Sequence, residues 1–248
     1  AVARRIAGDK LLVRDFPWIG DFAAARNFSL LAAEGAGAAW AVVVDTDERL
    51  DLGGLDVRRA LGDAAEDALF VAADEGHYAK ERFFRLPVRG RFVGPTHEAF
   101  VGELRGELPL VRFREVPKSA EAYVRKFARD AEILARHTAE HPDDPRWFYY
   151  LGESLKNLGR LDEAITAYDR CADLGGWDEE GAWACYQAAE CWIRLGDQAA
   201  AIRTCARGLA IHPGIAELAW LAAFAAHGAG RYDRAVAWAR MSIALGYA

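Results

Sequence analysis

The sequence lacks the features that would anchor it in a membrane or on a nucleic acid. Its longest apolar run near the C-terminus, Leu218–Ala226, is far shorter than the roughly 20 residues that cross a bilayer. The formal net charge is −6, whereas nucleic-acid-binding domains normally carry a basic excess. No secretory signal is recognisable at the N-terminus. We therefore expect a cytoplasmic protein without a transmembrane segment and without nucleic acid as a partner.

Cysteine is scarce, and its spacing argues against a zinc site. The four cysteines all lie in the C-terminal half, at Cys171, Cys185, Cys191 and Cys205. No two of them have the Cys-x-x-Cys spacing of a metal-binding pair. Each occupies a small-residue position in an apolar helical pattern, which favours buried, reduced thiols in a cytoplasmic protein.

The first half of the chain alternates short apolar segments with one clear helix. Asp21 can cap a helix from Phe22 to about Glu34. Trp40–Asp45 is apolar up to its last residue, as expected of a strand covered on both faces. Leu110–Glu115 alternates apolar and charged residues, as expected of a half-exposed strand. The other predicted strands are Leu11–Val13, Ala68–Ala73 and Lys80–Leu86.

From Ser119 onward the pattern is helical and it repeats. Gly159, Gly196 and Gly230 recur in similar segments, at intervals of 37 and 34 residues. Small residues keep the same intervals, at Gly152, Ala189 and Ala223 and at Ala164, Ala201 and Ala235. This period resembles the tetratricopeptide repeat, in which two antiparallel helices approach closely only where side chains are small. We therefore predict an α/β domain with a mixed sheet at residues 1–117 and an all-α solenoid at residues 118–248.

An acidic motif follows the predicted strand Trp40–Asp45. Asp45 and Asp47 lie at its carboxyl end, where open α/β sheets bind their ligands. A Mg²⁺ or Mn²⁺ ion held by such carboxylates would neutralise a diphosphate leaving group. The alternative is a solvated acidic turn without a ligand, and the residues alone do not decide between the two.

A second polar motif follows about fifty residues later, in a loop rich in glycine and proline. His97 and Glu98 offer an imidazole and a carboxylate there. A lone histidine in a loop is more often a surface or capping residue than a ligand. Arg26 and Asn27, one turn into the first helix, are placed to reach a phosphate or a ribose, although Arg26 is also compatible with a helix-surface arginine.

Several segments together resemble bacterial family 2 glycosyltransferases. They are Asp21–Asn27, the strand end Val44–Glu48, and Arg82–Arg85 leading to Gly94–Glu98. The subgroup with a tetratricopeptide tail is similar over nearly the whole chain, including segments like Pro142–Leu151 and Gly175–Glu180 of the tail. The resemblance implies a GT-A fold, a UDP-sugar or similar nucleotide-sugar donor, a divalent metal ion and inversion at the anomeric carbon.

The resemblance also implies roles for individual residues. Asp45 would face the nucleotide, together with Arg26, Asn27 and Arg85 as further donor contacts. Asp47 would ligate the metal ion, with His97 as a further metal or diphosphate contact. Inversion needs a carboxylate within hydrogen-bond reach of the acceptor, and the candidates are Glu98 and, behind it, Glu75.

One departure from the family pattern concerns the start of the chain. The family begins with a strand that carries an aspartate and with an Asp-x-Gly-Ser-x-Asp-Gly turn that binds the base. This sequence opens after that point, on a helix-like segment Ala1–Ile6 without an initial methionine. We therefore expect missing upstream sequence, an incomplete base pocket and an exposed sheet edge.

The repeat tail suggests a second kind of function. Stacked repeats present a concave surface suited to peptides or proteins, so the tail is expected to bind a peptide, protein or glycan acceptor or a second copy of the chain. The first helices of the repeats are rich in aromatic residues, most of which we expect in the core. The alternative to a glycosyltransferase is a non-enzymatic adaptor with a degenerate transferase domain. A metal-dependent phosphohydrolase ranks last, because it needs more ligands than the sequence offers.

Overall fold

The computed structural model describes residues 5, 8–74, 76 and 78–246, which form two units, Ala1–Lys118 and Ser119–Ala248. The helix expected at Ala1–Ile6 falls almost entirely outside the described residues. The elements of the first unit are η1 (Gly8–Lys10), α2 (Phe22–Gly35), β1 (Trp40–Val42), β2 (Glu48–Asp51), α3 (Val57–Asp63), β3 (Ala68–Ala73), β4 (Ala79–Arg85), β5 (Gly90–Val93), β6 (Ala99–Gly102) and β7 (Arg105–Glu115).

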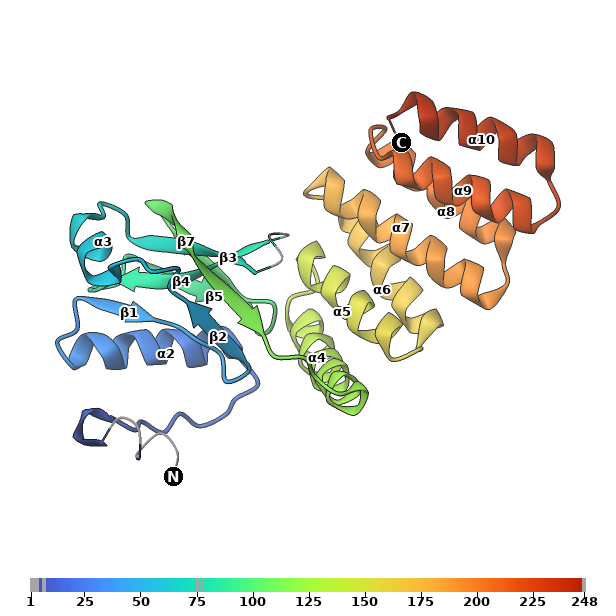
Figure 1. The fold of residues 1–248 in the computed structure, drawn as a ribbon. Coiled ribbons are helices and arrows are strands. Elements are labelled where there is room, and N and C mark those ends of the chain that lie inside the picture. The colour runs from blue at the N-terminus through green and yellow to red at the C-terminus, as the bar shows by residue number, and fades with distance from the viewer. Residues whose placement is uncertain (1–4, 6–7, 75, 77, 247–248) are drawn as a thin grey trace. The chain divides into compact units, whose positions relative to one another are not determined.

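The first unit is built on a five-stranded sheet in the order β1-β4-β3-β7-β2 (Figure 1). β3 and β7 are parallel, and the other neighbours are antiparallel, so the predicted mixed sheet is confirmed. β5 and β6 form a separate two-stranded hairpin. The register of β3 shifts after Leu69 against β4 and after Phe70 against β7, as at a β-bulge.

Two apolar clusters flank this sheet. In one, α2 packs through Ala23 and Leu30 against Phe84 of β4 and against the β5–β6 hairpin. In the other, α3 packs through Leu61 against Phe83 of β4. Because Phe83 and Phe84 are consecutive in a strand, their side chains point to opposite faces. Asp21 caps α2 by accepting a hydrogen bond from the backbone of Ala24, as predicted from its position before the apolar run.

Two of the predicted strands differ from the structure. Leu11–Val13 forms no strand, and Leu12 and Val13 are exposed. The segment Trp40–Asp45 is a strand only over Trp40–Val42, and within the described chain this strand pairs with β4 alone. Val42 and Val44 are 47% and 44% exposed. An apolar run therefore did not mean burial on both faces, because β1 lies at an edge of the sheet.

The other predicted strands are confirmed, and several elements of the structure were not predicted. Ala68–Ala73 is a strand, Lys80–Leu86 is shifted by one residue, and Leu110–Glu115 is the end of the longer β7. The unpredicted elements include β2, α3 and the β5–β6 hairpin. β2 begins at Glu48, within the acidic motif itself, because it pairs with β7. Its polar sequence, Glu-Arg-Leu-Asp, carries little strand propensity of its own.

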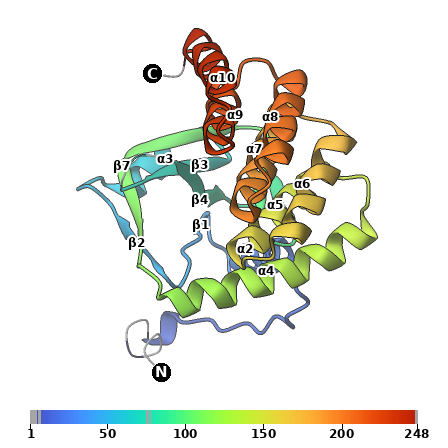
Figure 2. The same cartoon turned by 90° about the vertical axis from the view of Figure 1, so that its right-hand side faces the viewer.

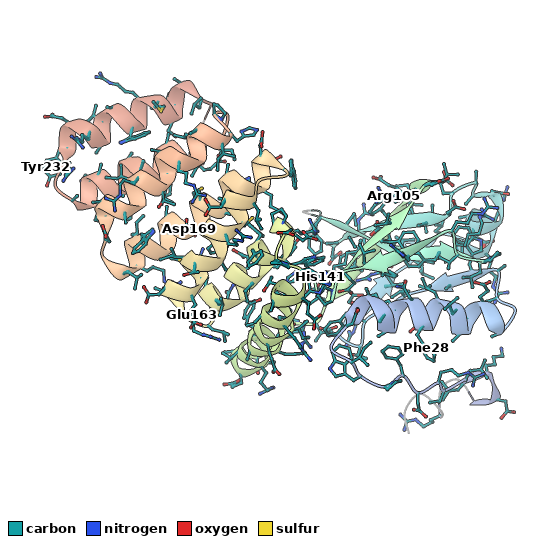
Figure 3. The ribbon with its side chains drawn as sticks, turned by 180° about the vertical axis from the view of Figure 1, so that it is seen from behind. Phe28, Arg105, His141, Glu163, Asp169 and Tyr232 are labelled. Carbon is teal, nitrogen blue, oxygen red and sulfur yellow. The ribbon has the colours of Figure 1, made fainter. Side chains whose placement is uncertain are left out.

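The second unit consists of helices only. One long helix, α4 (Ala120–Glu140), leads into three pairs of antiparallel helices, as the sequence period predicts (Figures 1 and 2). The pairs are α5 (Pro145–Asn157) with α6 (Leu161–Leu174), α7 (Asp178–Leu195) with α8 (Gln198–Ile211), and α9 (Ala216–Gly228) with α10 (Tyr232–Ala244). Asp169 of α6, labelled in Figure 3, forms an ion pair with Arg207 of α8, with 2.9 Å between Asp169 Oδ1 and Arg207 Nη1.

The small residues of the repeat explain how closely its helices approach. A Cβ added to Gly152 of α5 would lie 2.6 Å from the ring of Tyr168 in α6, so no larger residue fits without movement. Ala164 and Ala201 are fully buried. Gly159, Gly196 and Gly230 have positive φ angles of 76°, 87° and 70° just after the first helices, which glycine adopts without strain.

The cysteines and most aromatic residues of the repeats are core residues. All four cysteines are free and buried, and burial raises their thiol pKa values to about 11 or 12. Trp147 is buried, while Trp183, Tyr186 and Trp192 pack partly buried against the core. Among the described residues, none of the helices has both the length and the apolar character that a bilayer-spanning segment needs.

Candidate functional site

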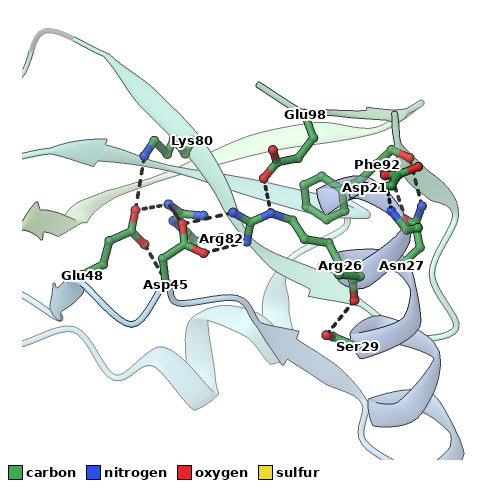
Figure 4. Close-up of polar contacts among 12 residues, drawn as sticks. Asp21, Arg26, Asn27, Ser29, Asp45, Glu48, Lys80, Arg82, Phe92 and Glu98 are labelled. Atoms are coloured by element: carbon green, nitrogen blue, oxygen red, sulfur yellow. Dashed lines mark hydrogen bonds and ion pairs between the residues drawn. The ribbon is translucent and has the colours of Figure 1, made fainter. Parts of the chain in front are cut away.

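Arg26 is the side chain that brings the two predicted polar motifs together (Figure 4). Its guanidinium group pairs with both carboxylate oxygens of Asp45, at 2.9 and 3.1 Å. Its Nε donates to the carboxylate of Glu98, which follows 72 residues later in the chain. All three side chains are partly buried, at 18%, 34% and 13% exposure for Arg26, Asp45 and Glu98. The structure thus joins helix α2, the end of the β1 segment and the loop before β6.

The ion pair changes the acidity of Asp45. Burial by itself raises the pKa of this carboxyl group, because it disfavours the charged form. The hydrogen bond and charge of Arg26, aided by Arg82 and Lys80, outweigh burial and hold the Asp45 pKa below its usual value. Asp45 is therefore an ionised partner of Arg26 near neutral pH and a poor candidate for a general base.

A second ion-pair network lies beside the first and was not predicted. Arg82 of β4 is 3% exposed and donates to Glu48, whose side chain is 1% exposed. Lys80, two residues earlier on the same strand, lies 3.2 Å from Glu48 and 2.7 Å from Glu115. Arg82 also approaches Asp45 at 3.5 Å, which links the two networks (Figure 4). The Arg82 Nε has no hydrogen-bond partner among the described residues.

Asp47 is paired with the end of the first unit. Lys118 Nζ lies 2.6 Å from Asp47 Oδ2, and the hydrogen bond and charge of this ammonium group lower the pKa of Asp47. The backbone carbonyl of Asp47 also accepts a hydrogen bond from Val116, at 2.7 Å. The acidic motif is therefore attached through both its side chain and its backbone to residues 116–118, immediately before helix α4 begins.

The remaining predicted site residues do not join this ion-pair cluster through their side chains in the contacts described below. His97 is exposed and has a positive φ of 49°, next to the Glu98 that contacts Arg26. Asn27 exchanges two hydrogen bonds with the backbone of Phe92, at 2.8 and 2.9 Å, and so attaches α2 to β5. Arg85 donates to the carbonyls of Ala64 and Glu66 and its guanidinium stacks over Trp40. Glu75 lies outside the described residues.

The arrangement does not fit a metal ion as it stands. Within the described part of the chain there is no group of three or more His, Cys, Asp or Glu side chains placed to hold one. The carboxylates of Asp45 and Asp47 are instead neutralised by the cations of Arg26 and Lys118. The metal-binding role of Asp47 and His97 stays a prediction, and at Asp47 it requires that Lys118 leave the carboxylate.

A signal for the unpredicted network is present in the sequence. Lys80 and Arg82 lie two residues apart in the predicted strand, and residues two apart in a strand share a face. Cations buried on a sheet face need carboxylate partners. Glu48, the first residue after Asp47, contacts both cations through its side chain, while the pairing of β2 with β7 sets it directly opposite Glu115. Only the register of β2 against β7 identifies this partner, and that register is a tertiary property.

The second unit repeats an aromatic residue at one position of its first helices. Tyr149, Tyr186 and Trp220 each lie three residues before the small residue of α5, α7 and α9. α5 lies beside α7, and α7 lies beside α9. Tyr149 and Tyr186 are partly buried, whereas Trp220 is 39% exposed. We call these three residues the aromatic ladder.

Further side chains connect these first helices and extend the ladder. Lys156 of α5 contacts Gln187 and Glu190 of α7, and Arg146 of α5 lies 3.5 Å from Glu180 of α7. On α9 the ring of Trp220 stacks with that of Phe224, one turn later, at a centroid distance of 6.0 Å. Phe224 is 55% exposed. The ladder thus ends in an exposed pair of stacked aromatic rings.

Comparison with known proteins supports the repeat assignment. A family model described as a tetratricopeptide repeat matches residues 148–174, which confirms a repeat of this kind in the second unit. No curated protein matches the sequence. Among solved structures, a crystal structure of MamA is similar at 21% identity and a TM-score of 0.44, over 48% of this chain and 68% of that chain. MamA from residue 41 to its end, from Desulfovibrio magneticus RS-1, is similar at 19% identity and a TM-score of 0.41, over 51% and 75%. Similarity at this level does not assign a function.

The ion pair between Arg26 and Asp45 generates a pH-dependent prediction. We expect Arg26→Gln to raise the Asp45 pKa, because burial would then be opposed only by the weaker charge effects of Arg82 and Lys80. In the unsubstituted protein the pair stabilises the fold above the unfolded Asp pKa of about 3.9, and this stabilisation is lost as the pH falls through the lowered folded pKa. An NMR titration of the side-chain carboxyl carbons measures the Asp45 pKa in the variant and in the unsubstituted protein.

A matched variant controls for general effects of removing a cation. Lys118→Gln should raise the pKa of Asp47, which Lys118 lowers, and should leave that of Asp45 unchanged. The pairing of Arg26 with Asp45 is contradicted when Arg26→Gln leaves the Asp45 pKa unchanged. It is also contradicted when the two variants shift the pKa values of both carboxyl groups equally.

Proposed function

We propose that this protein binds a peptide or protein partner through the aromatic ladder of its second unit. The observation that carries this proposal is the recurrence of Tyr149, Tyr186 and Trp220 at one position of three neighbouring helices. Tyr149 and Tyr186 pack partly buried against the core, whereas Trp220 is 39% exposed, so this position lies at the border between core and surface. The recurrence of an aromatic residue there supports a common task on a shared surface.

The chemistry of this surface favours a protein partner. Aromatic rings bury large areas with little loss of conformational freedom and are enriched among residues that dominate protein interfaces. The cations Arg146 and Lys156 of α5 are already paired with Glu180 and Glu190 of α7. Affinity would thus come mainly from burial of the rings, with the exposed Trp220 and Phe224 contributing most. A second copy of the chain is the alternative partner for the same face.

Substitution of the exposed ladder residue tests the proposal. A peptide is first selected from a random-peptide display library against the whole chain, and its affinity is measured by fluorescence anisotropy. We expect Trp220→Ala to weaken this affinity by at least about tenfold, because an anchor residue at an interface contributes about 2 kcal/mol or more. Trp177→Ala is the matched control, since Trp177 is 62% exposed but lies before α7, outside the ladder.

The outcomes separate the alternatives. Retained affinity in Trp220→Ala, or equal losses in both variants, contradicts binding at the ladder. The alternative is self-association through this face. It is supported when no peptide is selected, when the molecular mass in solution rises with protein concentration, and when Trp220→Ala restores the mass of the monomer.

A second candidate function, transfer of a sugar from a nucleotide-sugar donor by the first unit, is favoured by one observation. Arg26, Asp45 and Glu98 belong to the three segments that carry the resemblance to glycosyltransferases, and the structure holds them in contact. Segments that are far apart in the chain converge here. Among the predicted catalytic residues, Glu98 faces the Arg26 cation, so a role as base would first require its release from that ion pair.

The proposed metal dependence of this second function depends on Asp47. A divalent cation at this carboxylate would compete with Lys118, which now neutralises it. We expect Asp47→Ala to abolish binding of UDP in the presence of Mn²⁺, and turnover of a UDP-sugar with it, while the circular dichroism spectrum stays unchanged. A calorimetric titration with UDP and Mn²⁺ measures the binding.

The control for this experiment is an aspartate elsewhere in the same unit. Asp63 is exposed at the end of α3, and its ion pair with Arg59, at 3.9 Å, is exposed as well, so Asp63→Ala should bind UDP as the unsubstituted protein does. UDP binding that survives in Asp47→Ala rules out the metal role. Absence of any UDP binding leaves the adaptor as the function of the chain.

A further inference from the structure

We propose that the first unit has a binding site for a small phosphorylated anion on the face of strands β2 and β7 that carries Arg49, Arg112 and Arg114. These arginines line a cavity of about 300 Å³, together with Asp51 and Asp74. The site is separate from the ion pairs of Arg26 and from the aromatic ladder. The proposal does not depend on either of the functions proposed above.

The register of the two strands brings like charges together. β2 and β7 are antiparallel, with Arg49 directly opposite Arg114 and Asp51 directly opposite Arg112. Side chains of directly opposed residues lie on the same face of a sheet, with Cβ atoms about 5 Å apart, and like charges in this arrangement are destabilising. The pairing of Arg49 with Arg114 therefore concentrates positive charge at one place on the sheet.

The opposite face of the same strands also brings two like charges together, and there another side chain of the protein neutralises them. There, Glu48 lies directly opposite Glu115, which also places two like charges together. Lys80 of β4 lies between them, 3.2 Å from Glu48 and 2.7 Å from Glu115, and bridges the pair. A cation from β4, a strand of the same sheet that is not adjacent to β2 or β7, thus neutralises the carboxylates on that face.

No described side chain bridges the arginine pair in this way. Asp74 pairs with Arg114 alone, at 2.8 Å from its Nε. Asp51 accepts a hydrogen bond from the backbone of Gly53, and no ion pair joins it to a described residue. Within the described chain Arg49 has no ion-pair partner, and Arg112 donates only to the carbonyls of Pro109 and Val111. Two of the three arginines on this face, Arg49 and Arg112, therefore have no carboxylate partner within the described chain, whereas Arg114 has Asp74.

The chemistry of the three side chains defines the class of ligand. Guanidinium groups form paired hydrogen bonds to phosphate oxygens and remain charged at all physiological pH values. A cavity of about 300 Å³ is at the small end of ligand sites. It suits a diphosphate or a small phosphate ester and is too small for a larger ligand to be enclosed. A divalent metal ion is not needed, because arginine supplies the positive charge.

Inorganic pyrophosphate is the probe that tests the site. Its affinity for the whole chain is measured by isothermal titration calorimetry with EDTA present, which removes any contribution from divalent cations. We expect saturable binding that Arg49→Gln weakens about tenfold or more, as expected for the loss of a hydrogen bond between charged groups. Arg58→Gln should bind as the unsubstituted protein does, because Arg58 is exposed on α3 and outside the cavity.

Thermal unfolding provides a second readout that does not depend on heat of binding. Without anion, Arg49→Gln should unfold at the same temperature as the unsubstituted protein or higher, since it removes a like-charge pair. Pyrophosphate should raise the midpoint of the unsubstituted protein and of Arg58→Gln, but not that of Arg49→Gln. The proposal is overturned when sodium chloride of the same ionic strength raises the midpoint equally, when Arg49→Gln binds as well as Arg58→Gln, or when no binding is detected.

Discussion

Arg26 is the residue on which the arrangement of the first unit depends. It lies in helix α2 and pairs with Asp45, 19 residues later, and with Glu98, 72 residues later. A partly buried guanidinium is tolerated only when carboxylates or other acceptors surround it. The one side chain therefore fixes how the helix, the end of the β1 segment and the loop before β6 meet. Removal of its charge would leave Glu98 without its ion-pair partner and Asp45 with only the more distant Arg82, at 3.5 Å.

The surrounding charges follow the same rule. Arg82 and Lys80 of β4 neutralise Glu48 and Glu115, and Lys118 neutralises Asp47. The acidic motif is thus neutralised by cations of the chain itself. This arrangement accounts for two facts together, namely the burial of Glu48 and the lowered pKa values of Asp45 and Asp47. It also sets the condition for any metal-dependent chemistry, because a metal ion would have to compete with an ammonium or guanidinium group already in place.

The face of β2 and β7 that carries arginines departs from this rule. On one side of these strands the like charges of Glu48 and Glu115 have a bridging cation, and on the other the like charges of Arg49 and Arg114 have no bridging anion within the described chain. The carboxylates of the acidic motif are thus paired with cations, whereas the positive charge of Arg49 stays accessible. The contrast within one pair of strands is stronger evidence for a ligand than exposed arginines alone would be.

Local signals in the sequence predicted the elements that depend on local chemistry. The cap at Asp21, the alternation in Leu110–Glu115 and the small residues of the repeats each determine structure over a few residues. The errors concern tertiary position. Trp40–Asp45 has the apolar composition of a central strand, but the sequence does not contain the strand order that puts β1 at an edge.

The candidate site was predicted to a smaller extent. Asp45, Arg26 and Glu98 were predicted as polar site residues, and the structure holds them in contact. The sequence did not indicate that they would neutralise one another, because an ion pair between residues 72 positions apart depends on the register of strands and on the placement of a helix. Asn27 shows the same limit, since its hydrogen bonds to Phe92 exist only once α2 lies against β5.

The most direct test of this account is the coupling energy between Arg26 and Glu98. A double-mutant cycle of Arg26→Gln and Glu98→Gln, with the free energy of unfolding measured in urea, isolates their interaction from the separate effects of each change. The account predicts a coupling of about 1 kcal/mol or more, as expected for a charged hydrogen bond that is largely shielded from water. Additive changes, with no coupling beyond about 0.3 kcal/mol, would contradict the convergence of the two polar motifs on Arg26.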